Sequence, residues 1–290
     1  ILEVDGDVEQ IKAIVDDAMK AGAERDVGHD YLQDFEERYS ETARVTAPTP
    51  WDLINELMQG GLGQGELGVV VAPAGIGKSW VLSSLGAYAI SQKLNVVHYT
   101  LELNESYVGL RYDSIFSGVE GQNLKYHKEE VQEKIFDLDG KLTIKYYPTK
   151  TCTVNTLAAH LKKVTSFGGE VNMVLVDYAD IMRDVNKTTE MRHALGNIYE
   201  DLRGLAGELQ VPIWTASQAN RSALDEDVIE ATKVAESYAK VMTADFVMSL
   251  SRKVEDKIGN TGRFHVIKNR FGPDGLTFPA KINTNIGKIE

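Results

Sequence analysis

The sequence has 290 residues, of which 43% are hydrophobic and 26% charged, with one cysteine and a formal net charge of −12 at pH 7. This composition is typical of a globular protein, and no apolar run approaches the roughly 20 residues that a membrane helix needs, which excludes a membrane-embedded chain. Because Cys152 stands alone and the acidic N-terminal stretch has no signal-peptide pattern, we expect no internal disulfide, no export and a cytoplasmic protein.

The negative charge is concentrated at the start of the chain. Residues 1–45 contribute −8 of the net charge, which leaves −4 for the remaining 245 residues. A body this close to neutral can carry a local basic channel, so the acidic total does not exclude a nucleic-acid partner. Because the first residue is isoleucine rather than methionine, we expect a fragment of a longer chain.

The first predicted element is an amphipathic helix over residues 7–22. Four apolar side chains recur there at helical spacing: Val8, Ile11, Val15 and Met19. A short helix with one apolar stripe needs a partner surface, either on this chain or on a neighbouring subunit. Residues 31–43 are polar and predict a second helix, and two prolines within residues 46–50 predict a loose linker. We therefore divide the chain into an acidic helical arm, residues 1–49, and a main domain, residues 50–290.

The main domain alternates apolar strand-like runs with helical segments. Strands are expected at 67–71, 96–101, 142–147, 171–177 and 211–216, and helices at 51–58, 78–92, from 104, at 126–138, 154–167 and 190–210. A polar loop at 219–236 precedes three further strands at 245–251, 263–268 and 276–283. Nearly all-apolar strands between helices predict an α/β fold with a mainly parallel sheet covered on both faces. The turn sequence Phe271-Gly272-Pro273-Asp274-Gly275 predicts antiparallel pairing at the C-terminal end.

A phosphate-binding loop is predicted between the first of these strands and the helix that follows it. The sequence there is Ala72-Pro73-Ala74-Gly75-Ile76-Gly77-Lys78-Ser79. Backbone N–H groups in such a loop and the N-terminus of the next helix face the anion, while the lysine contacts the β- and γ-phosphates and the serine a Mg²⁺ ion. An ordinary glycine turn is the alternative, and the strict pattern has glycine in place of Ala72, but the later glycines, the lysine and the serine are intact. The predicted nucleotide-binding residues are Ala74, Gly75, Ile76, Gly77, Lys78, Ser79 and Trp80.

Polar side chains follow three of the predicted strands. In an open parallel sheet, ligands bind beyond the carboxyl ends of the strands, so we expect these side chains at one site. Asp177 is expected to hold Mg²⁺, usually through a water, although a strand-end aspartate can also cap a turn. Glu102 is expected to polarise the water that attacks the γ-phosphate, with a surface glutamate before a helix as the alternative. Gln218 is placed to contact the γ-phosphate or that water and to report its loss to the next loop, although alone it reads better as a polar strand end.

The last predicted strand end carries two cations, Lys268 and Arg270, on either side of Asn269. Side chains at i and i+2 of a strand point to the same side. One interpretation is an edge strand with a basic face that prevents pairing with other strands. The functional interpretation is a pair of cations inserted into the nucleotide site of a neighbouring subunit, where positive charge stabilises the transferring phosphoryl group.

In this order, these motifs resemble the DnaB family of replicative helicases, whose motor is a RecA-like ATPase. The similarity covers residues 50 to 285 and rests on Gly60–Leu67, the phosphate loop, Thr100–Leu103, Leu175–Tyr178, Ser217–Arg221, Ala244-Asp245 and Lys268–Pro273. The phosphate loop is shared by many NTPases. The segment that begins at Lys268 is much more specific, because it separates this family from the recombinases built on the same core.

The resemblance implies ATP and Mg²⁺ as cofactors. It implies the following roles: Lys78 at the phosphates, Ser79 and Asp177 at the metal, Glu102 as catalytic base, Gln218 as the sensor that links nucleotide state to a DNA loop, and Arg270 as an arginine finger acting in trans with Lys268 beside it. It also implies a ring of six subunits that moves 5′ to 3′ along single-stranded DNA, with primase or other replisome proteins as partners, in a bacterial or phage-infected cell. The helix at residues 7–22 resembles the linker helix that docks on the adjacent motor.

Two departures from the family pattern concern the N-terminus and the DNA contacts. The 290 residues contain no segment that resembles the helical domain preceding the motor in this family, so the resemblance does not extend to the primase-binding collar. In the loop before Ala244, the family usually has an arginine before Glu-Ser and a glycine after it, whereas this chain has Ala235 and Tyr238 at these positions. DNA contacts are therefore expected from backbone N–H groups and from the basic residues Arg183, Lys187 and Lys233.

Two other functions are compatible with the same core. One is a recombinase-like ATPase that forms a filament on DNA, which an outward polymerisation strand before the core would favour. The other is a nucleotide-gated scaffold or helicase loader that hydrolyses weakly. Glu102 argues against the scaffold, because such a protein needs no carboxylate at that strand end.

Overall fold

The computed structural model describes residues 15, 28, 30–40, 44–234 and 239–290. Its contacts divide the chain into two units, Ile1–Arg44 and Val45–Glu290. In the first unit, helix α2 covers Phe35–Ser40, which confirms part of the helix predicted over residues 31–43. The amphipathic helix predicted over residues 7–22 lies outside the described residues, apart from Val15.

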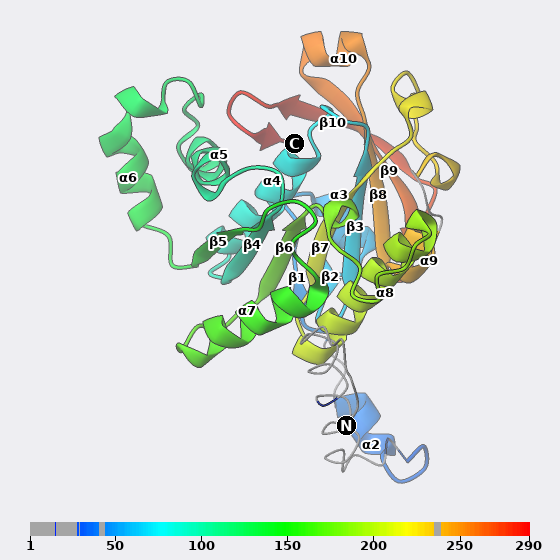
Figure 1. The fold of residues 1–290 in the computed structure, drawn as a ribbon. Coiled ribbons are helices and arrows are strands. Elements are labelled where there is room, and N and C mark those ends of the chain that lie inside the picture. The colour runs from blue at the N-terminus through cyan, green and yellow to red at the C-terminus, as the bar shows by residue number, and fades with distance from the viewer. Residues whose placement is uncertain (1–14, 16–27, 29, 41–43, 235–238) are drawn as a thin grey trace, which may run out of the picture. The chain divides into compact units, whose positions relative to one another are not determined.

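The second unit is built on a nine-stranded sheet with the strand order β11-β10-β9-β8-β3-β7-β6-β4-β5 (Figure 1). The parallel part consists of β8 (Phe246–Ser251), β3 (Leu67–Ala72), β7 (Ile213–Gln218), β6 (Met173–Asp177), β4 (Val96–Thr100) and β5 (Leu142–Tyr146). The antiparallel part consists of β9 (Thr261–Asn269), β10 (Thr277–Asn283) and β11 (Lys288–Ile289). A mainly parallel sheet with antiparallel strands at its C-terminal end is therefore confirmed. We call the edge at which the parallel strands end the carboxyl edge, and the edge at which they begin the amino edge.

Helices cover both faces of this sheet. One hydrophobic cluster contains side chains of α3 (Asp52–Leu57), α4 (Lys78–Ser91) and α5 (Glu105–Ser117), and the other contains side chains of α7 (Val154–Ser166), α8 (Met191–Leu209) and α9 (Ala239–Thr243). Every residue of β3 is buried, because both of its faces are covered, and this explains its continuous apolar sequence. Two further helices, α6 (Lys128–Phe136) and α10 (Val254–Gly259), lie at the outside of the fold in Figure 1.

The loose linker predicted over residues 46–50 is wrong. Thr46–Ala47 forms strand β1, which pairs antiparallel with β2 (Leu62–Gly63). Trp51, just after the prolines, is buried, and its indole Nε1 donates a hydrogen bond to the carbonyl of Ile289, 3.1 Å away. The prolines exclude a regular helix here, but they do not prevent two residues from pairing or a tryptophan from anchoring the segment to the core.

The polar loop predicted over residues 219–236 contains short ordered turns in its described part. These are η3 (Arg221–Ala223) and η4 (Ala231–Lys233), and an isolated bridge joins Ala219 to Val234. Two other short turns, η1 (Leu124–Tyr126) and η2 (Ala179–Ile181), follow α5 and β6. The short elements α9, α10 and β11 were not predicted. Among the described residues, no helix has the length and apolar character required to cross a bilayer.

Candidate functional site

The predicted phosphate loop connects β3 to α4 in the structure. Gly75 and Gly77 have φ angles of +73° and +124°, in the region that L side chains rarely adopt, so both positions require glycine. Gly77 is the N-cap of the 14-residue helix α4, whose N-terminus therefore faces the loop. The side chain of Ile76 is buried in the core, which leaves only its main chain to face a phosphate. The other predicted nucleotide-binding residues, Ala74, Gly75, Gly77, Lys78, Ser79 and Trp80, line one open cavity of about 460 Å³.

Lys78 bends back over this loop. Its Nζ donates to the carbonyls of Ala72 and Pro73, at 3.3 and 3.5 Å, and lies 5.4 Å from the centre of the Tyr178 ring. Burial lowers the pKa of Lys78, and the nearby carboxylates, those of Asp177 and Glu102 among them, act in the opposite direction. The ammonium group is thus held at the loop by weak neutral acceptors that phosphate oxygens can replace.

The three predicted strand-end residues lie side by side on the carboxyl edge. Ala72, at the end of β3, pairs with Gln218 of β7. Asp177 ends β6, and its carbonyl accepts a hydrogen bond from the amide of Leu101, which directly precedes Glu102. Glu102 and Gln218 line the same cavity as Lys78. The structure therefore brings the sequence-predicted carboxylates, amide and lysine together around the phosphate loop.

Asp177 has the surroundings expected of a metal carboxylate. It is 2% exposed, and burial raises the pKa of its carboxyl group, while a hydrogen bond from Ser79 acts in the opposite direction. Its Oδ1 is buried and has no hydrogen-bond partner among the described residues. A buried carboxylate oxygen without a partner costs free energy that a bound cation or its water offsets. The residues present therefore fit Mg²⁺ held between Ser79 and Asp177.

Four further polar side chains line the cavity and were not predicted from the sequence: Arg111, Arg252, Lys257 and Thr284. The guanidinium of Arg111, from α5, stacks over the Trp80 ring at 5.2 Å, and its Nη1 is buried without a hydrogen-bond partner among the described residues. Arg252 comes directly after the parallel strand β8, so the strand-end rule that selected Asp177 would also have selected it. Nothing in the sequence marks Arg111, because its neighbours come from another helix.

Lys268 and Arg270 lie on the amino edge of the sheet, opposite the phosphate loop. Because β8 runs parallel to β3 and β9 runs antiparallel to β8, the last residue of β9 pairs with the first residue of β8. Lys268 Nζ donates to the carbonyls of Val241 and Met242 at 3.0 and 2.5 Å. Arg270 is 54% exposed, and its Nη1 lies 2.7 Å from Oδ1 of Asp245. These cations can therefore approach a nucleotide only on another copy of the chain.

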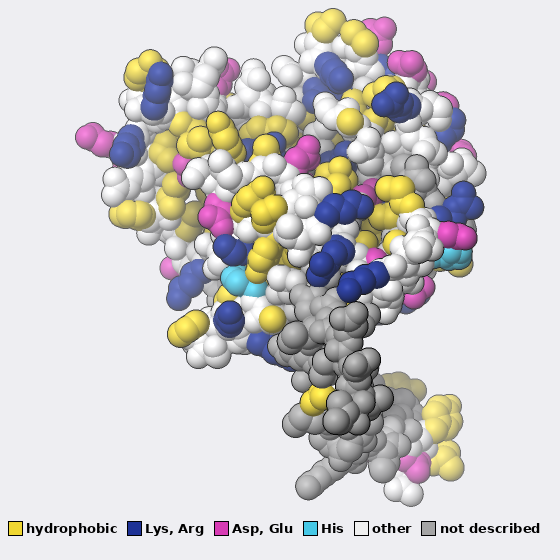
Figure 2. Space-filling view, viewed as in Figure 1, with side chains coloured by type: hydrophobic (Ala, Val, Ile, Leu, Met, Phe, Trp, Pro, Cys, Tyr) yellow, Lys and Arg dark blue, Asp and Glu magenta, His cyan; other side chains and the backbone are white. Residues whose placement is uncertain are grey.

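The basic residues expected to contact DNA lie in the loops after β6 and β7. Arg183 and Lys187 lie between η2 and α8, where Lys187 is exposed, and Lys233 ends η4 with its Nζ 3.0 Å from Glu226. Figure 2 shows several Lys and Arg side chains gathered at the middle of the face on which α8 lies in Figure 1. Residues 235–238, where the chain departs from the family pattern, lie outside the described residues.

Comparison with known proteins gives concordant results. The family model described as the DnaB-like helicase C terminal domain matches residues 48–285. A DnaB-like replicative helicase of Enterobacteria phage T4 is 27% identical over 282 residues, which are 92% of this chain and 59% of the phage protein. The replicative DNA helicase DnaB of Helicobacter pylori strain J99 is 27% identical over 173 residues, which are 58% of this chain and 35% of that protein. The chain thus spans less than two thirds of the length of either relative.

Solved structures share the fold. A DnaB-like replicative helicase, described together with its interactions with primase, gives a TM-score of 0.76 at 17% identity, over 97% of this chain and 71% of that one. A second solved structure, described as an ATPase domain, superposes with a TM-score of 0.74 at 17% identity and covers 98% of both chains. The expectation of a RecA-like ATPase core is confirmed at the level of the fold.

Proposed function

The chain belongs to the DnaB-like helicase family, and we propose that it is the motor of a replicative DNA helicase, which couples Mg²⁺-dependent ATP hydrolysis to 5′-3′ movement along single-stranded DNA. The observation that carries the proposal is the division of charged groups between the two edges of the sheet. The phosphate loop, Glu102 and Asp177 lie on the carboxyl edge, whereas the cations Lys268 and Arg270 lie on the amino edge. Such a layout suits subunits that complete one another's nucleotide sites.

In this mechanism, the chain's own residues hold the nucleotide and orient a water. The loop amides and Lys78 bind the β- and γ-phosphates, and Lys78 exchanges its contacts with Ala72 and Pro73 for phosphate oxygens. Ser79 and Asp177 would hold Mg²⁺, which when bound would supply positive charge against the developing charge on the phosphates. Glu102, exposed at the end of β4, accepts the proton of the attacking water.

Two further groups act at the γ-phosphate end. Gln218 contacts the γ-phosphate or the attacking water, and Arg111 adds a positive charge from the same chain. Arg270 of the next copy, with Lys268 beside it, stabilises the charge of the transferring phosphoryl group, as an arginine finger does. The proposed assembly is a homohexamer. Single-stranded DNA is bound through Arg183, Lys187 and Lys233, and primase is a candidate partner.

Mixing of two inactive variants tests the proposal. Arg270→Ala and Lys78→Ala should each lose most single-stranded-DNA-stimulated ATPase activity, roughly 10³–10⁵-fold for a true finger. In a random 1:1 mixture, about a quarter of the interfaces pair an intact pocket with intact cations, so up to about a quarter of the wild-type turnover should return. Turnover that does not return on mixing, in assemblies whose size matches wild type, would refute a finger acting in trans.

Arg203 offers a matched control, because it is a second arginine on the same carboxylate. Its Nε lies 2.5 Å from Oδ2 of Asp245, which is 1% exposed. Arg203→Ala removes an equal charge from Asp245 without removing the exposed guanidinium of Arg270. It should lower stability and leave turnover per folded assembly near wild type. Equal loss of turnover in both arginine variants would assign Arg270 a structural role only.

A further inference from the structure

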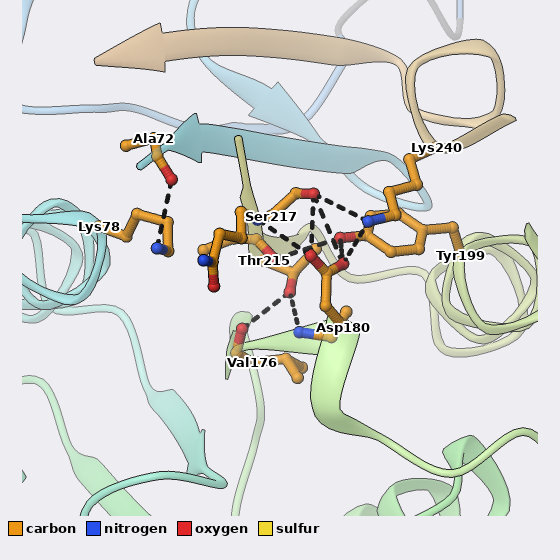
Figure 3. A network of polar contacts seen from close by, with 11 residues as sticks. Ala72, Lys78, Val176, Asp180, Tyr199, Thr215, Ser217 and Lys240 are labelled. Carbon is orange, nitrogen blue, oxygen red and sulfur yellow. Dashed lines mark hydrogen bonds and ion pairs between the residues drawn. The ribbon is translucent and has the colours of Figure 1, made fainter. Parts of the chain in front are cut away.

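Lys240 of α9 and Asp180 of η2 form a largely buried ion pair within a network of polar contacts (Figure 3). Lys240 is 1% exposed, and its Nζ lies 2.8 Å from Oδ1 of Asp180. The same Nζ donates to Oγ of Ser217 at 3.2 Å and lies 5.6 Å from the centre of the Tyr199 ring. The pair thus connects α9 to three other elements: η2, β7 and α8.

The carboxylate of Asp180 also fixes the end of the strand that carries Gln218. Its Oδ2 accepts the backbone N–H of Gln218 at 2.9 Å, and its Oδ1 accepts the hydroxyl of Tyr199 at 2.8 Å. Asp180 follows Asp177 by three residues, so one short turn joins the proposed metal carboxylate to this network. Asp180 therefore holds the backbone N–H of Gln218, and Gln218 itself lines the phosphate cavity.

Stability alone does not account for this pair. Removing two charges from water is costly, and an apolar pair of similar volume is often as stable or more stable in such a place. Here the hydroxyls of Tyr199 and Ser217 and the amide of Gln218 supply the additional hydrogen bonds that make the charges tolerable. What the pair provides is a defined position of α9 relative to the end of β7.

The cations of the amino edge are held by α9 and by Asp245, which follows it. The carbonyls of Val241 and Met242, both in α9, accept hydrogen bonds from Lys268. Asp245, two residues after α9, forms an ion pair with Arg270 through its carboxylate. Its carbonyl oxygen also accepts a hydrogen bond from the backbone N–H of Arg270, 3.0 Å away. The segment from Lys240 to Asp245 therefore contacts the network at Gln218 at its beginning and the two cations of the amino edge further along.

We propose that Lys240 is a positioning residue that links a subunit's own nucleotide site to the cations it presents to the next subunit. Through Asp180 and Lys240, α9 is fixed to the end of β7, and Lys268 and Arg270 are in turn held by α9 and by Asp245, so the ion pair sets the position of the two cations. Contiguous packed groups of this kind carry coupling between sites. This inference rests on the proposed function, because it takes Arg270 to act on the neighbouring nucleotide.

The test places the change in a subunit that supplies only cations. Subunits that carry Lys78→Ala and the paired change Lys240→Met with Asp180→Asn are mixed with Arg270→Ala subunits, whose pockets are intact. The paired change leaves no unbalanced buried charge, and methionine fills most of the lysine volume. We expect kcat in the mixture to fall roughly 3- to 30-fold relative to the mixture without the paired change. KM for ATP should not change, because the pockets that bind ATP are unaltered.

Two controls separate a positioning role from general damage. Lys93→Met breaks an exposed Lys–Asp pair of the same 2.8 Å length, with Asp139, and should leave kcat unchanged in the same mixture. If the paired variant does not assemble, Lys240→Leu with Asp180→Asn, which also leaves no unbalanced buried charge, is placed in the cation-supplying subunit, with the same expected fall in kcat. A kcat within twofold of the unmodified mixture would overturn the inference. Absence of turnover in the unmodified mixture would instead overturn the proposed function.

Discussion

Gly68, the second residue of the strand that carries the phosphate loop, should not tolerate even one added methyl group. It pairs directly with Trp214 of β7. A Cβ built on Gly68 would lie 2.5–2.7 Å from three atoms of that indole ring, closer than real Cβ atoms approach other atoms. Trp214 is fully buried and packs edge-on against Phe246 at 6.0 Å, so the ring has no free space to move into.

The expected cost of Gly68→Ala follows from this geometry. Overpacking of a dense core costs about 1–3 kcal/mol, and a fully buried rigid ring packed against Phe246 places this site in the upper half of that range. Gly204, in α8, is the matched control, because it is exposed and its Cβ would meet nothing within 4 Å. Gly204→Ala should stabilise the protein by about 0.5–1 kcal/mol, since alanine is the better helix former.

Urea unfolding, followed by tryptophan fluorescence at one fixed protein concentration, measures both changes. The two variants should differ by about 2.5–4 kcal/mol in free energy of unfolding, with opposite signs relative to wild type. Binding of a fluorescent nucleotide by Gly68→Ala reports whether the shift of β3 reaches the phosphate loop. A Gly68→Ala protein as stable as wild type would show that Trp214 can move, and the argument from close packing would be wrong.

Three further substitutions test the site and its electrostatics. Glu102→Gln should retain nucleotide binding and lower the rate of single-turnover hydrolysis by about 10²–10⁴-fold. An unchanged rate would show that Glu102 is not the catalytic base. Asp177→Asn should raise the Mg²⁺ concentration needed for half-maximal turnover by about 10–100-fold. It should also increase the free energy of unfolding in the absence of nucleotide. An unchanged dependence of turnover on Mg²⁺ concentration would contradict the metal role. Burial raises the pKa of Asp201 to about 6, with Asp184 and Glu200 adding to the effect. Ionisation of Asp201 therefore lowers the free energy of unfolding as the pH rises toward 6. Asp201→Asn should raise the free energy of unfolding by about 1–2 kcal/mol at pH 8 and by little at pH 4. Urea unfolding at both pH values measures this difference.

The residues that the sequence located best are those at strand ends. An apolar run followed by a polar residue marks the end of a buried strand, and parallel strands end at one edge, so Asp177, Glu102 and Gln218 had to converge once the sheet was recognised. The glycines of the phosphate loop were equally readable, because Gly75 and Gly77 need left-handed backbone angles that few other residues adopt. At these positions, the residue type and the predicted fold class lead to the same placement of the side chain.

Side chains whose partners come from distant elements were not predictable. Lys240 and Asp180 are separated by 59 intervening residues in the sequence, and a lysine in such a short helix is expected to be solvent-exposed until the helix is placed. Arg111 stacks on a tryptophan of another helix, and Trp51 is anchored by the last strand of the chain. In each case a long-range contact decides the burial of the side chain, and a local sequence pattern does not predict that contact.

The placement of the two functional edges also restricts how copies of this chain can assemble. In a two-fold dimer, the same patch of each subunit meets its counterpart, so pocket and cations would have to lie on one patch. Here they lie on opposite edges of the sheet, separated by the length of β3. If Arg270 acts on a neighbouring nucleotide, the contact must be head-to-tail, and it produces either a closed ring or an open filament. A size measurement with nucleotide bound distinguishes the ring from the filament, and a discrete two-fold dimer would be incompatible with the trans role of Arg270.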